Sequence, residues 1–118
     1  MSQEQIFEIQ AELYRAMGHP LRLEIIHLLR AGPMNVNDIA SATHTNQPTI
    51  SRNLAILKNV GLVVTHRNGT NAIYQVANPK IMSVCDMMHE VLSIQIGERS
   101  KLMDEKERKE INDNHEQK

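Results

Sequence analysis

Apolar side chains recur every three or four residues along most of the chain, and this spacing predicts amphipathic helices. The pattern changes after Gly61, where β-branched residues and then alternating polarity predict two strands joined at Asn68-Gly69. The predicted helices span residues 3–17, 20–32, 36–42, 47–61 and 79–97, and the predicted strands span 62–67 and 72–76. The chain is therefore expected to be mainly α-helical with one small β-hairpin.

Residues that favour helix ends stand at these boundaries. A capping side chain or an early proline stands at the start of four of the five predicted helices, because the first backbone N–H groups of a helix lack partners within it. A glycine, which accepts a left-handed backbone, follows two of the helix ends. The residues concerned are Pro20, Asn35, Asn46, Pro48, Asn78 and Pro79 at the starts, with Gly32 and Gly61 at the ends.

The helices over 36–42 and 47–61 are separated only by the turn 43–45, which predicts a helix-turn-helix. Ile50, Leu54 and Leu57 form an apolar face on the second helix. The opposite face gathers short hydrogen-bonding groups and one guanidinium near the start of the helix, where base edges and phosphates are contacted in DNA-binding helices. These candidate DNA contacts are Gln47, Thr49, Ser51, Arg52 and Asn53, with Lys58 further along the helix.

A two-stranded hairpin after a helix-turn-helix is typical of a wing. Its tip is basic and polar, so we expect it to contact phosphates or the minor groove, although a solvated turn charge is the simpler explanation. The tip residues are Arg67, Asn68, Gly69, Thr70 and Asn71.

Composition limits the remaining possibilities. The 118 residues suffice for one domain, and the single cysteine fits a reducing cytoplasm. No apolar run is long enough to span a bilayer and no signal peptide is recognisable, so no membrane partner is expected. Aromatic residues make up only 3%, which argues against a protein that stacks single-stranded bases.

The net charge of −1 conceals an uneven distribution. No acidic residue occurs between Asp38 and Asp86, and that interval carries +4, leaving −5 elsewhere. A polyanion responds to such a local basic surface more than to the total charge. Both predicted DNA-binding elements lie inside this interval.

The helix over 79–97 has a wide apolar face that a small winged domain has no obvious place to bury. We expect it to pack against the same helix of a second copy, supported by the first helix, since about 1,000 Å² of buried surface would suffice for a stable dimer.

Mixed charges dominate residues 98–118. The expected organisation is a DNA-binding and dimerisation domain over 1–97 and a partly disordered, charged extension over 98–118.

Three segments resemble the ArsR/SmtB family of bacterial winged-helix repressors. They are AMGHPLRLEII at 16–26, NQPTISRNL at 46–54 and LKNVGLV at 57–63. The resemblance implies a homodimer built from the first and last helices, operator DNA bound in successive major grooves, and release by an effector. It places Gln47, Thr49, Ser51 and Arg52 in the recognition helix and residues 67–71 in the wing. Many members carry His at the position of Asn53.

The effector sites of the family do not match this chain. The third helix lacks the cysteines of arsenic- and cadmium-type members, the last helix lacks the zinc-type spacing, and persulfide sensors need two cysteines. The remaining candidates are Cys85, Asp86 and His89. Two Cys85/His89 pairs meeting across a dimer axis could bind zinc or another soft metal, and a disulfide between subunits or a haem pocket are alternatives. Simple packing of Cys85 is favoured, because one chain shows no full ligand set, and no metal or cofactor is identified.

These patterns predict a homodimeric, cytoplasmic transcriptional repressor that binds double-stranded operator DNA and responds to an unidentified effector. The alternative is a winged helix used for protein–protein contact, which the acid-free interval disfavours. An enzyme is not expected, because no nucleophile–base pair, phosphate loop or paired carboxylates occur at usable spacing.

Overall fold

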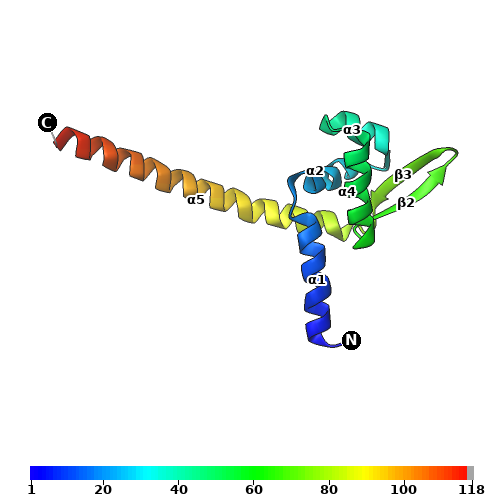
Figure 1. The fold of residues 1–118 in the computed structure, drawn as a ribbon. Helices are drawn as coiled ribbons and strands as arrows, with labels where there is room; N and C mark the ends of the chain where they lie inside the picture. The colour runs from blue at the N-terminus through cyan, green and yellow to red at the C-terminus, as the bar shows by residue number, and fades with distance from the viewer. Residues whose placement is uncertain (117–118) are drawn as a thin grey trace. The chain divides into compact units, whose positions relative to one another are not determined.

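The computed structural model describes the backbone of residues 1–116 and the side chains of residues 1–99 and 101–111. The elements follow one another as α1 (Gln3–Met17), α2 (Pro20–Leu29), β1 (Met34–Asn35), α3 (Val36–Thr43), α4 (Gln47–Asn59), β2 (Val63–Asn68), β3 (Asn71–Val76) and α5 (Lys80–Glu116) (Figure 1). They form two units, residues 1–82 and residues 83–118. The first unit holds every element except most of α5.

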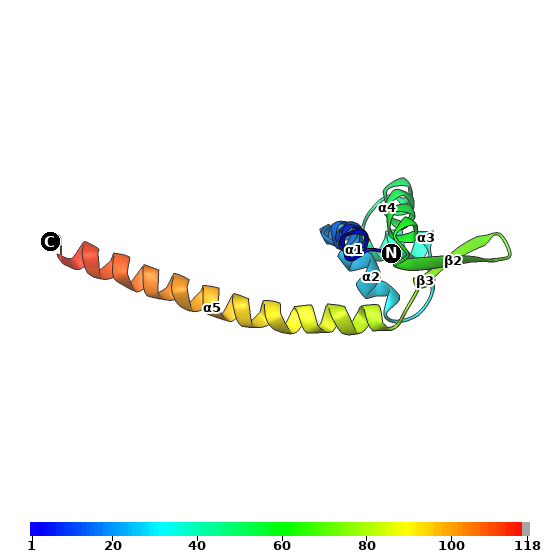
Figure 2. The same cartoon turned by 90° about the horizontal axis from the view of Figure 1, so that it is seen from below.

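The core of the first unit lies among α2, α3, α4 and the start of β2. Figures 1 and 2 show α2, α3 and α4 grouped together, with the hairpin of β2 and β3 extending away from them. The side chains with essentially no exposure are all aliphatic: Ile25, Ile26, Ile39, Ile50, Leu54, Leu57, Leu62 and Val63. The helical periodicity seen in the sequence therefore predicts which faces turn inward.

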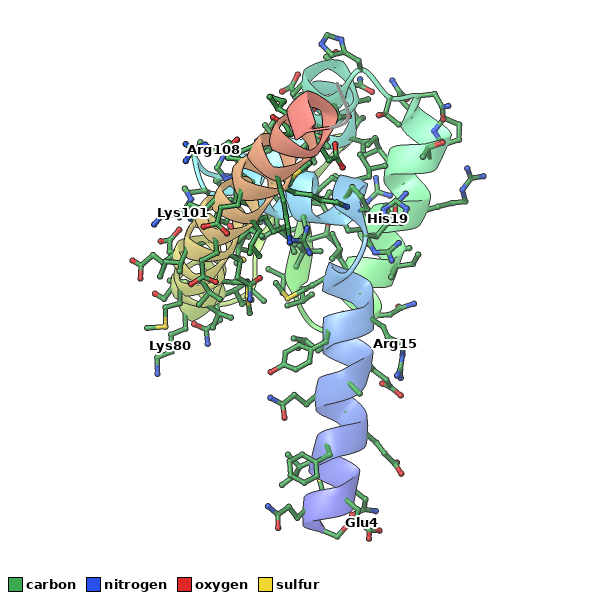
Figure 3. The ribbon with its side chains drawn as sticks, turned by 90° about the vertical axis from the view of Figure 1, so that its left-hand side faces the viewer. Glu4, Arg15, His19, Lys80, Lys101 and Arg108 are labelled. Carbon is green, nitrogen blue, oxygen red and sulfur yellow. The ribbon has the colours of Figure 1, made fainter. Side chains whose placement is uncertain are left out.

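Side chains cap the helices as the sequence indicates. Asn35 Oδ1 accepts from Asp38 N at 2.8 Å at the start of α3, and Asn46 Oδ1 accepts from Thr49 N at 2.9 Å at the start of α4. His19 caps α2, since its Nδ1 accepts from Leu21 N at 3.3 Å. Figure 3 shows His19 where α1 and α2 meet. His19 is thus a turn residue with a structural role.

The turn between α3 and α4 has no glycine, and His44 takes the left-handed conformation there, with φ 53°. A non-glycine residue tolerates this region at a modest conformational penalty. The backbone N–H of His44 donates to carbonyls of α3, so the turn satisfies groups at the helix end. The chain can therefore turn tightly from one helix of the pair to the next.

The sheet has three strands, in the order β1-β3-β2, whereas the sequence predicts only two. The extra strand, β1, pairs antiparallel with β3 through Met34 opposite Tyr74 and Asn35 opposite Ile73. Two residues are too short to show an alternating pattern, which explains why the sequence does not reveal β1. The strand ties the start of α3 to the base of the wing.

The wing turn lies one residue later than predicted. Asn68 and Asn71 face each other as the last pair of β2 and β3, so the loop residues are Gly69 and Thr70. Gly69 has φ +66°, as in type II′ turns, which place glycine at the first loop position. The glycine is needed here because a β-carbon disfavours this backbone conformation.

The sequence predicts a last helix that runs to about Gly97 or beyond, and α5 continues to Glu116 (Figure 1). Acidic residues stand four positions before basic ones, as in Asp104/Arg108 and Glu105/Lys109, and this spacing supports an exposed helix. The expected domain boundary at Gly97 therefore does not coincide with a break in the helix. Partial disorder of 98–118 stays a prediction, and residues 117 and 118 lie outside the described residues.

Candidate nucleic-acid interface

The two faces of α4 separate the core from the proposed DNA surface. Ile50, Leu54 and Leu57 are fully buried beneath the helix. On the other side Gln47, Ser51, Arg52 and Lys58 are exposed, and Thr49 is half-buried. Arg52 Nη2 donates to Thr49 Oγ1 at 3.2 Å, so the guanidinium is held along the helix surface. The early turns of α4 thus present the donors and acceptors that base edges and phosphates require.

Asn53 does not belong to this exposed face, and its placement there from the sequence is wrong. The side chain is only 9% exposed. Its Nδ2 donates to the Thr49 carbonyl at 2.8 Å, and its Oδ1 accepts from Arg22 Nη1 at 3.0 Å. Burial and these two hydrogen bonds direct the Asn53 side chain into the protein and not onto the exposed face of α4. Its amide is satisfied inside the protein, as buried polar groups require.

The side-chain partner of Asn53 is Arg22, which the sequence alone does not single out. Its charge predicts a water-facing position, yet the residue is half-buried and its Nε also donates to the Ala16 carbonyl. The sequence spacing indicates this burial. Arg22 lies three, four and seven residues before Ile25, Ile26 and Leu29, so it falls on the buried face of α2. A charged residue in register with a buried face indicates a buried partner.

The wing places its polar residues at its far end. Arg67, Asn68, Gly69, Thr70 and Asn71 are all exposed. Six residue pairs join the two strands, from Val63 opposite Val76 to Asn68 opposite Asn71. The length of this ribbon separates the polar tip from the helices. A short, rigid ribbon ending in a guanidinium can reach a phosphate or enter a minor groove.

The basic interval found in the sequence is also basic on the surface. Its four cationic residues, Arg52, Lys58, Arg67 and Lys80, are all exposed. The interval contains no carboxylate to offset them. Exposed cations attract a polyanion over several ångströms of solvent.

The effector candidates all lie on α5. Cys85 is half-buried, while Asp86 and His89 are exposed. Among the residues that the structure describes, no three side chains of the His, Cys, Asp or Glu type come together to hold a metal ion. The described side chains of a single chain therefore do not form the ligand set that zinc or a similar metal needs.

Two helices carry large apolar side chains on their surfaces. On α1 these exposed residues are Ile6, Phe7, Ile9 and Tyr14. On α5 they are Val84, Met87, Met88, Val91, Leu92, Ile94, Ile96, Leu102, Met103 and Ile111. Apolar surface on this scale marks an interaction site. Within the described part of the chain, no helix is both long and apolar enough to cross a bilayer.

The helix pair α3 and α4, followed by the hairpin β2–β3, defines a winged helix-turn-helix DNA-binding protein. The family model described as bacterial regulatory protein, arsR family, matches residues 19–65. An HTH-type transcriptional regulator of Methanocaldococcus jannaschii is 35% identical over 86 residues, covering 72% of this chain and 97% of the relative. The chain belongs to the ArsR family of bacterial regulatory proteins. It is a DNA-binding transcriptional regulator and not an enzyme.

Two further relatives agree with this assignment. The transcriptional regulator NmtR of Mycobacterium tuberculosis is 36% identical over 76 residues, covering 64% of this chain and 63% of NmtR. The solution structure of a homodimeric winged helix-turn-helix DNA-binding domain from Mycobacterium bovis, a possible ArsR-family regulator, has a TM-score of 0.73 and 32% identity. That likeness covers 79% of this chain and 88% of the other. The family expected from the sequence is therefore confirmed, as is the winged fold.

Proposed function

We propose that this protein is a homodimeric repressor that binds operator DNA with the exposed face of α4 and the wing, and leaves it when an effector binds. The observation that carries the proposal is the distribution of charge. All four cations between Asp38 and Asp86 are exposed on the winged helix-turn-helix unit, and no acid occurs among them. Such a protein would act in the cytoplasm, where bacterial DNA lies.

The base contacts and the phosphate contacts would come from different residues. Gln47, Thr49 and Ser51, at the start of α4, would contact base edges in the major groove, each good bidentate contact contributing about 1–3 kcal/mol of discrimination. Arg52, Lys58 and Arg67 would neutralise phosphates, which gives affinity without sequence preference. Asn68, Gly69, Thr70 and Asn71 would bring the wing backbone against the DNA.

A second copy would complete the site. The exposed apolar residues of α1 and α5 are suited to pairing with another chain, and the Mycobacterium bovis relative is homodimeric. Two recognition helices in a symmetric dimer would read half-sites about one DNA turn, or roughly 34–36 Å, apart. An effector would act by favouring a dimer geometry that does not match this spacing.

The candidate effector site is the Cys85/His89 pair of α5. Cys85 and His89 are four residues apart on α5 and so share one side of the helix. A metal ion or a redox, sulfur or small-molecule signal could act there if both copies contributed ligands. Among the described side chains of one chain, no group of three possible ligands is assembled, so a metal would need ligands from both copies. The competing explanation is that Cys85 only packs.

The experiment that tests the function starts from random DNA. The wild-type protein is used to enrich duplexes from a random library, and its affinity for an enriched duplex and a scrambled one is measured by fluorescence anisotropy. We expect enrichment of a sequence with two half-sites, and weaker binding by the Arg52→Ala variant.

The matched control is Arg108→Ala, which removes an exposed cation of α5 that is not among the proposed DNA contacts. It should bind like the wild type. If the wild-type protein binds no duplex at low salt, the proposal is refuted. Protein–protein contact is then left as the function of the winged domain.

A further inference from the structure

The guanidinium of Arg22 links three helices of the first unit. Arg22 belongs to α2, its Nε donates to the carbonyl of Ala16 in the last turn of α1, and its Nη1 donates to Asn53 Oδ1 in α4 at 3.0 Å. Because arginine keeps its charge at all physiological pH values, both hydrogen bonds are charge-assisted and stronger than neutral ones. The side chain therefore joins α1 to α4 through α2.

The hydrogen bonds continue from Asn53 to the exposed face of α4. Asn53 Nδ2 donates to the Thr49 carbonyl at 2.8 Å, and Arg52 Nη2 donates to Thr49 Oγ1 at 3.2 Å. A continuous series of polar contacts thus leads from the end of α1 to a guanidinium in the proposed DNA interface. Neither Arg22 nor Asn53 reaches that interface itself.

The chemistry of the two neighbours restricts what residue 53 can be. A guanidinium only donates hydrogen bonds, and a backbone carbonyl only accepts them. The side chain between them must accept on one side and donate on the other, which an amide does. At 9% exposure, water has little access to replace either bond. The amide orientation of Asn53, and with it the contact between α2 and α4, is fixed by both partners.

From this geometry we infer that Arg22 and Asn53 form a positioning pair, which sets the orientation of α4 relative to α1 and so makes base recognition possible. The inference rests on the proposed DNA-binding function, in which α1 joins the two copies. Base contacts require hydrogen-bond geometry within tenths of an ångström, whereas attraction between cations and phosphates tolerates displacement. Loss of the pair should therefore reduce operator selectivity much more than general affinity for DNA.

The test compares selectivity, which is the ratio of affinities for the enriched duplex and the scrambled duplex. The variants are Arg22→Met and Asn53→Leu, which keep the approximate volume and remove the hydrogen bonds. We expect each to bind the enriched duplex about tenfold more weakly or worse, the loss of one good base contact. Affinity for the scrambled duplex should stay within about twofold, because its phosphate contacts remain. The double variant should lose about as much as either single variant and clearly less than their sum, since the two residues act through one bond.

The matched control is Ile26→Val, which removes one methylene from a fully buried residue of the same helix. It lowers stability by a core mechanism but leaves the polar contacts intact, so its selectivity should equal that of the wild type. Circular dichroism at the assay temperature establishes that each variant is folded.

Folded variants that retain wild-type selectivity would overturn the inference. If both single variants unfold, the wild-type protein still decides it: NMR should show a slowly exchanging Arg22 Nη1–H, the group that donates to Asn53 Oδ1, and its resonance should move when the enriched duplex binds. A rapidly exchanging or unresponsive Nη1–H would refute the pair. If the wild type enriches no sequence at all, the proposed DNA-binding function fails instead, which is a separate result.

Discussion

Replacing Arg67 by alanine tests three points in one measurement. They are whether the wing contacts a phosphate, how many protomers bind one duplex, and whether the exposed cations supply the affinity. Each protomer presents three cations to phosphates in the proposed complex: Arg52, Lys58 and Arg67, all exposed. A dimer would therefore neutralise about six phosphates. Since each neutralised phosphate contributes about −0.9 to the slope of log K against log salt concentration, the wild-type slope should be about −5. Affinity should then fall about a thousandfold between 50 and 200 mM salt.

The Arg67→Ala variant removes one cation from each copy, so two are lost from the complex. We expect the slope to become less negative by about 2 if a dimer binds, and by about 1 if a single protomer binds. Fluorescence anisotropy with the enriched duplex, repeated at four or more salt concentrations, measures this change directly. Thermal unfolding should be unchanged, because Arg67 is exposed at the end of the hairpin.

The control for this measurement is again Arg108→Ala, which removes a cation that the proposed complex does not use. Its slope should match that of the wild type. A slope unaffected by Arg67→Ala would show that the wing tip is a solvated charge, and an equal change for both variants would show that the salt effect reports net charge rather than contact.

Three further predictions concern stability and sensing. Asn46→Ala removes the side-chain cap that accepts from Thr49 N at 2.9 Å, and should lower the free energy of unfolding by about 1 kcal/mol in urea titrations. An unchanged midpoint would mean that water replaces the cap. Leu54→Ala empties a fully buried position on α4 and should cost about 2–5 kcal/mol by the same assay; a loss below about 1 kcal/mol would contradict the core described above. Cys85→Ser should abolish release from the enriched duplex by zinc, cadmium, arsenite, persulfide, peroxide or haem if the cysteine senses, whereas an unaltered response would assign it to packing.

Periodicity in the sequence was sufficient to predict most of the architecture. Ile50, Leu54 and Leu57 recur at helical spacing and are buried, and the caps Asn35 and Asn46 occupy the predicted helix starts. These features are local, because the spacing of apolar residues and the first unpaired N–H groups of a helix depend on a few neighbouring residues. The order of the elements then implied a winged helix-turn-helix.

The tertiary structure decided what depends on contacts between distant residues. The polar character of Asn53 suggested the outer side of α4, although its position three residues after Ile50 and four before Leu57 is that of the buried face. The partner that satisfies its amide there, Arg22, stands 31 positions earlier in the sequence. Strand β1 forms because the completed edge of β3 offers partners to Met34 and Asn35. A single chain shows local patterns of polarity, but a buried hydrogen bond requires both partners in place, and only the folded protein brings them together.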